Sequence, residues 1–99
     1  MTFQIFAREG CEICNKAKEV LSRLGVEVKV RYVDGPNATV ENLADFAWFG
    51  WTDTPPLVVV TEEDRVIKRW DGAEISDTNR SWHLEVKRWV ESQIQIRRS

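Results

Sequence analysis

Long hydrophobic runs are missing from this 99-residue chain. The longest are Ala47–Trp51 and Leu57–Val60, whereas a helix that spans a membrane needs about 20 apolar residues. A secretory leader is not visible either, because Arg8 and Glu9 interrupt the N-terminal apolar stretch before a hydrophobic region could form. We therefore expect a cytoplasmic protein that has no contact with a membrane.

The chain also has no excess of positive charge. It carries 14 lysines and arginines against 16 aspartates and glutamates, which gives a formal net charge of -2. Proteins that bind nucleic acid usually present a basic face to the phosphates. The charge balance therefore argues against a nucleic-acid partner.

Cysteine and histidine are scarce, and this restricts the chemistry. The chain has two cysteines, Cys11 and Cys14, and one histidine, His83. A disulfide between cysteines three residues apart closes a loop too short to stabilise a fold strongly. A zinc site would need two more ligands, and the scarcity of histidine, with His83 alone, argues against one within a single chain. Redox chemistry is the leading interpretation; a metal or cluster shared between two chains, or two unreactive cysteines, are the alternatives.

The first part of the chain predicts a strand, a helix and a second strand. Thr2–Ala7 is rich in aromatic and β-branched residues, which favours a strand. Apolar residues then recur with helical spacing from Ile13 onward, and Gly25 is a suitable helix end. Val26–Val33 alternates valines with charged residues and predicts the second strand.

A second helix is expected after the turn that follows this strand. Thr39 can cap its N-terminus, and the helix should end near Gly50. Its expected apolar face consists of Val40, Leu43, Ala44 and Ala47.

The last part of the chain predicts a hairpin and a final helix. Leu57–Val60 suits a strand buried on both faces, and a polar turn at residues 62–64 joins it to Arg65–Trp70. A loop through Ser76 and Asp77 should lead to a helix with Trp82 on its apolar side. The order β-α-β-α-β-β-α predicts an α/β fold in one domain, residues 1–99, with a four-stranded mixed sheet and three helices on its faces.

The placement of the cysteine pair matters more than its spacing. Cys11 falls at the start of the first predicted helix, where unpaired backbone N–H groups and the helix dipole favour a thiolate. Cys14 lies one turn further, toward the face that should be buried. Cys11 is thus the candidate nucleophile, and Cys14 is the candidate that resolves a mixed disulfide.

Three features together resemble the thioredoxin/glutaredoxin superfamily, and the chain length favours its glutaredoxin branch. They are the strand–Cys11-x-x-Cys14–helix unit, Thr54-Pro55 before a buried strand, and Gly72 before the final helix. The resemblance covers nearly the whole chain and implies a thioredoxin-like fold. It also implies that Pro55 is a cis proline opposite the cysteines, and that Thr54 offers its backbone to an extended substrate.

Several positions depart from the patterns of the known branches. Arg8 replaces the lysine with which glutaredoxins usually grip a carboxylate of glutathione, so the positive charge is kept. The dipeptide Glu12-Ile13 matches neither glutaredoxins nor thioredoxins, and Ile5 stands where thioredoxins carry a buried carboxylate. The Trp70-Asp71-Gly72 segment looks closer to glutaredoxin-like hydrogen donors of ribonucleotide reductase. The electron donor therefore stays open between glutathione and thioredoxin reductase.

Aromatic residues precede the Thr54-Pro55 loop in unusual number. Trp48, Phe49 and Trp51 together exceed what one helix face can bury. They could form a rim that holds a protein disulfide, and Trp51 is the residue of this rim that we predict to bind the substrate. Ordinary packing of the second helix is the alternative.

The function that we expect is a thiol–disulfide oxidoreductase that reduces protein or glutathione-mixed disulfides through a Cys11/Cys14 cycle. The predicted binding residues are Arg8, Trp51, Thr54, Pro55 and Gly72. No bound cofactor or metal is expected, glutathione is a candidate reductant, and an upstream reductase would complete the cycle of a monomeric protein. The alternative is a non-catalytic binding module or a metal or iron–sulfur carrier that uses the same cysteines.

Overall fold

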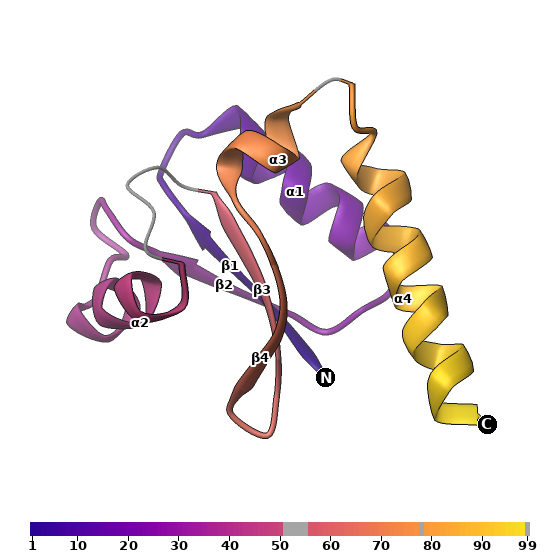
Figure 1. Cartoon of the computed structure of the whole chain (residues 1–99). Helices are drawn as coiled ribbons and strands as arrows, with labels where there is room; N and C mark the ends of the chain where they lie inside the picture. The colour runs from indigo at the N-terminus through magenta and orange to yellow at the C-terminus, as the bar shows by residue number, and fades with distance from the viewer. Residues whose placement is uncertain (51–55, 78, 99) are drawn as a thin grey trace.

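The described residues form a four-stranded mixed sheet. The computed structural model describes residues 1–50, 56–77 and 79–98. The strand order is β2-β1-β3-β4, with β1 parallel to β2 and antiparallel to β3, which is antiparallel to β4 (Figure 1). The strands are β1 (Thr2–Ala7), β2 (Val28–Tyr32), β3 (Leu57–Glu62) and β4 (Arg65–Trp70). The predicted mixed sheet is confirmed.

Helices cover both faces of this sheet. One face carries α1, α3 and α4, and the other carries α2 (Figure 1). In the described part of the chain the helices are α1 (Glu12–Arg23), α2 (Val40–Gly50), α3 (Gly72–Ser76) and α4 (Trp82–Arg98). None of them is long and apolar enough to cross a membrane.

The short helix α3 corrects the expectation of a loop between Trp70 and the last helix. Asp71 is its N-cap: its carboxylate accepts a hydrogen bond of 2.9 Å from the Glu74 N–H, and the Glu74 carboxylate accepts one of 3.3 Å from the Asp71 N–H. This reciprocal arrangement is a capping box. The described chain thus has four helices, not three.

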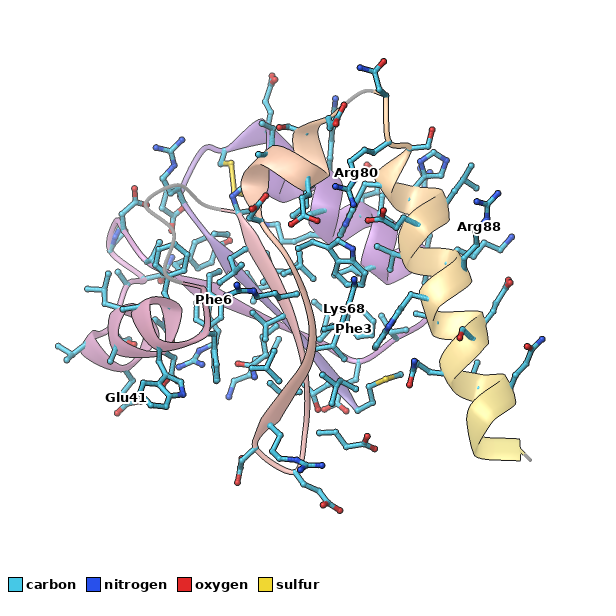
Figure 2. The ribbon with its side chains drawn as sticks, viewed as in Figure 1. Phe3, Phe6, Glu41, Lys68, Arg80 and Arg88 are labelled. Atoms are coloured by element: carbon cyan, nitrogen blue, oxygen red, sulfur yellow. A yellow bond between two sulfur atoms is a disulfide. The ribbon has the colours of Figure 1, made fainter. Side chains whose placement is uncertain are left out.

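An arginine ties α3 to α4. The guanidinium of Arg80 donates to Glu85 at 2.7 Å and lies 3.3 Å from a carboxylate oxygen of Glu74. The hydrogen bond to Glu85 raises the pKa of Arg80 above its ordinary value. Figure 2 shows the Arg80 side chain between the two helices. The ion pairs thereby join the start of α4 to α3, the short helix that begins at Gly72.

The core has two halves, one on each face of the sheet. Phe3, Ile5 and Ala7 of β1 pack beneath α1 and α4, whereas Phe6 packs against α2. The side chains of Leu57–Val60 are also shared between the two faces, as predicted for a strand buried on both sides. The half beneath α1 and α4 is the larger one, and it contains three tryptophans. The ring of Trp70 stands edge-on to those of Trp82 and Trp89, with ring centroids 6.0 and 5.8 Å apart.

The buried face of α2 differs from the one expected. Val40 is 83% exposed and Leu43 is 48% exposed, while Phe46 is buried and packs on Phe6 with ring centroids 5.7 Å apart. Residues 44 and 47 are exposed as well. The predicted apolar face was therefore wrong.

A polar anchor on β2 explains which way α2 faces. Arg31 donates from Nε to the Asn42 side-chain oxygen at 2.8 Å and pairs with Asp45 at 2.7 Å. Asn42 and Asp45 share a helix face with Phe46 and Phe49, since they are spaced three and four residues apart. Turning Val40 and Leu43 inward would leave Arg31, whose side chain is only 11% exposed, without these partners.

Candidate active site

Cys11 is the N-cap of α1, as the sequence predicts. Its backbone is extended (φ -93°, ψ 116°), and its carbonyl accepts the first helical hydrogen bond from Asn15 N–H at 3.1 Å. The Cys11 Sγ itself accepts from the Cys14 N–H at 3.2 Å. A sulfur in the place of a capping oxygen is therefore held where backbone N–H groups and the helix dipole stabilise negative charge.

The two sulfur atoms form a disulfide across the first turn of α1. The Cα atoms of Cys11 and Cys14 are 5.3 Å apart, which lies within the normal range for such a bond. Figure 2 shows it as a yellow bond close to α3. The pair can thus exist as a disulfide without rearrangement of the helix.

The two cysteines differ in burial. Cys11 is half-buried, whereas Cys14 is 1% exposed and belongs to the larger core with Ala17 and Trp82. A reagent or substrate disulfide in solvent therefore reaches Cys11 and not Cys14. This asymmetry is the one expected for an attacking and a resolving thiol.

The loop before Cys11 is fixed by contacts that no local pattern predicted. The Asp34 carboxylate accepts from the Glu9 N–H at 3.1 Å, and the Glu9 carboxylate accepts from the Asn37 side chain at 2.9 Å. These bonds join residues 25 and 28 positions apart. They hold Glu9 against the turn after β2, two residues before the N-cap of α1.

Comparison with known proteins identifies the family. The family model described as Glutaredoxin matches residues 3–63, which is more than half of the chain. The chain belongs to the glutaredoxin family. No curated protein sequence matches it significantly.

The fold is also shared with a solved thioredoxin. The structure of thioredoxin 1 from the thermophilic eubacterium Thermosipho africanus TCF52B resembles this glutaredoxin-family chain with a TM-score of 0.60 and 18% sequence identity. The similarity covers 94% of this chain and 98% of that one. At this identity the likeness shows the fold alone, and it confirms the predicted thioredoxin-like class.

The structure locates some of the predicted binding residues of this glutaredoxin-family protein. Arg8 is exposed, three residues before Cys11. Gly72 is buried as the first residue of α3, and α3 contacts α1. Trp51, Thr54 and Pro55 lie outside the described residues, so the roles predicted for them stay predictions.

Side chains that could bind a metal do not gather elsewhere in the described residues. Within residues 1–50, 56–77 and 79–98, no three histidine, cysteine, aspartate or glutamate side chains cluster as a metal site would require. His83 is exposed on α4.

Proposed function

We propose that this glutaredoxin-family chain is a thiol–disulfide oxidoreductase that works through a Cys11/Cys14 dithiol–disulfide cycle. The observation that carries the proposal is the asymmetric pair at the start of α1, where one sulfur is the accessible N-cap and the other is buried one turn behind it. Family membership supports the same chemistry.

The cycle balances as two successive thiol–disulfide exchanges. The Cys11 thiolate attacks one sulfur of a substrate disulfide, and the other substrate sulfur leaves as a thiolate that takes a proton from water. Cys14, after losing its proton, then attacks Cys11 Sγ and releases the second substrate thiol. The substrate gains two electrons and two protons, and the protein is left with the Cys11–Cys14 disulfide.

An external reductant closes the cycle by returning two electrons. Two molecules of glutathione or one dithiol of a thioredoxin-reductase-linked donor would each balance the step. Arg8, exposed before Cys11, is suited to a carboxylate of glutathione or of a peptide substrate. Protein disulfides and glutathione-mixed disulfides are the proposed substrates.

The experiment compares wild type with Cys11→Ser and Cys14→Ser on an insulin disulfide and on a glutathione-mixed disulfide. We expect Cys11→Ser to lose activity on both. Cys14→Ser should lose insulin reduction and accumulate a mixed disulfide on Cys11 that mass spectrometry detects. Full activity of Cys11→Ser, with its fold confirmed by circular dichroism, would refute the proposed nucleophile.

The same variants separate two routes. If Cys14→Ser keeps turnover on the glutathione-mixed disulfide, a second glutathione resolves the intermediate and the protein can work as a monothiol enzyme. Loss on both substrates would show that the dithiol route is required. A wild type that turns over with neither glutathione nor thioredoxin reductase would contradict the oxidoreductase proposal as a whole.

A further inference from the structure

A hollow lies between α1, α3 and the start of α4, and it reaches the first turn of α1, which carries the cysteine pair. It begins at Ile13, the residue before Cys14, and has a volume of about 420 Å³. Half of its lining residues are apolar, among them Val20, Ile75 and Trp82. A volume of this size falls within the range of sites that enclose ligands or side chains.

A second hollow continues the first along the same helices. It measures about 340 Å³, and Val20 and His83 line both. Together they follow α1 from Ile13 to Leu24, which we call the α1/α4 groove. Eleven helical steps correspond to about 16 Å, enough for about five residues of extended peptide.

The charge of this groove is opposite in sign to that of the whole chain. Its charged lining residues, among those described, are Lys16, Arg23, Lys87 and one acidic residue, Asp77. The Asp77 carboxylate already accepts a hydrogen bond of 2.9 Å from a backbone N–H, and Arg23 pairs with Glu19 within α1. Lys16 and Lys87 are exposed. The chain as a whole carries a net charge of -2.

We propose that the α1/α4 groove binds an acidic, apolar peptide segment of the protein whose disulfide is reduced. Apolar side chains of the segment would lie against Ile13 and Val20, and its carboxylates would lie near Lys16 and Lys87. Because Ile13 at one end of the groove lies between Cys11 and Cys14 in the sequence, a segment bound at that end would extend toward Cys11. The inference rests on the proposed function and gives it a substrate class.

Charge complementarity decides in favour of an acidic partner. A segment with basic residues would meet Lys16 and Lys87 as like charges, which costs affinity at close range. Exposed charges are screened by salt, so the preference for acidic residues should weaken as ionic strength rises. Both effects can be measured without any redox step.

The test uses two short fluorescein-labelled peptides that lack cysteine, one alternating leucine with glutamate and one alternating leucine with lysine. Fluorescence anisotropy gives the Kd of each for the oxidised protein at low and high salt. We expect the glutamate peptide to bind at least about tenfold more tightly at low salt. Lys16→Glu and Lys87→Glu should each weaken it about fivefold or more.

Lys29→Glu is the matched control. It makes the same change of charge on an exposed residue of β2 that does not line the groove. Its Kd for the glutamate peptide should stay within about twofold of wild type. Equal binding of the two peptides, or an equal loss in all three variants, would overturn the groove as the docking site.

Binding and catalysis can fail separately in this design. Cysteine-free peptides report binding to the groove without any redox step, whereas insulin reduction requires the cysteine pair. A chain that reduces insulin but binds neither peptide would refute the groove and leave the oxidoreductase proposal intact. Concentration-dependent dimerisation that excludes the glutamate peptide would assign the groove to a second copy of the chain and overturn the proposal.

Discussion

Glu9 lies so close to Gly35 that a Cβ atom added to the glycine would stand 2.5 Å from Glu9 Cγ. Gly35 also has a φ of +77°, a conformation that residues with a side chain rarely adopt. The glycine thus allows Glu9 to cross the turn after β2 and reach Asn37. The contact between Glu9 and Gly35, which are 26 positions apart in the sequence, thereby supports the loop between Arg8 and Cys11.

Gly35→Ala should destabilise the protein more than Gly25→Ala does. Both glycines have positive φ, which costs an alanine about 1–2 kcal/mol, but nothing lies within 4 Å of the Cβ position at Gly25. At Gly35 the added methyl group would also force the exposed Glu9 side chain to move, and the loss of its hydrogen bond with Asn37 adds up to about 1 kcal/mol. Urea unfolding of the two variants measures the difference.

A second variant tests whether this difference comes from the contact between Glu9 and Gly35. Glu9→Ala removes the atom at 2.5 Å, so it should cost less in the Gly35→Ala background than in wild type. If Gly35→Ala and Gly25→Ala lower the free energy of unfolding equally, the close approach of Glu9 to Gly35 does not contribute to the cost of the substitution.

Phe46→Ala and Val40→Ala test which face of α2 is buried. Phe46 packs on Phe6 and is 9% exposed, so its truncation should cost about 3 kcal/mol. Val40 is 83% exposed, and its truncation should change the free energy of unfolding by less than about 0.5 kcal/mol. The reverse order would support the face that the sequence predicts.

This helix shows why part of the fold could not be predicted from local sequence. The apolar spacing of Val40 and Leu43 is compatible with a buried face, but the choice between two faces depends on Arg31 of another strand. Strands such as β1 and the helix after Cys11 were predicted correctly, because their own periodicity and end residues determine them. Element type is local, whereas the face that is buried is a tertiary property.

The candidate site also has one part that local sequence predicts and one part that depends on tertiary contacts. Cys11 and Cys14 are close in sequence, so their position at a helix start could be predicted, and the structure places them there. The bonds of Glu9 to Asp34 and Asn37 depend on the parallel pairing of β1 and β2 and have no local signal. The Asp71-x-x-Glu74 capping box was present in the sequence, but five helical residues are too few to show periodicity.

Asp71→Ala should shorten or unfold α3 and lower the free energy of unfolding by about 1 kcal/mol. The carboxylate is the acceptor that satisfies the Glu74 N–H at the helix start. Asp71→Asn keeps an acceptor of the same geometry and should retain most of the stability. Urea unfolding compares the two variants, and an asparagine as costly as the alanine would show that charge, and not capping, is the source of the effect.

In the reduced protein, iodoacetamide should modify Cys11 at least about tenfold faster than Cys14, because reactivity follows thiolate character and access. Cys11 is half-buried at the helix N-cap, and Cys14 is 1% exposed in the core. A time course of peptide mapping by mass spectrometry measures both rates in one sample.

In urea the two rates should converge, since unfolding removes both the helix dipole and the burial. Cys14→Ser should leave the Cys11 rate high, whereas Cys11→Ser should leave only slow labelling. Equal rates in the native protein would contradict the assignment of an attacking and a resolving cysteine, because burial would then give Cys14 no protection.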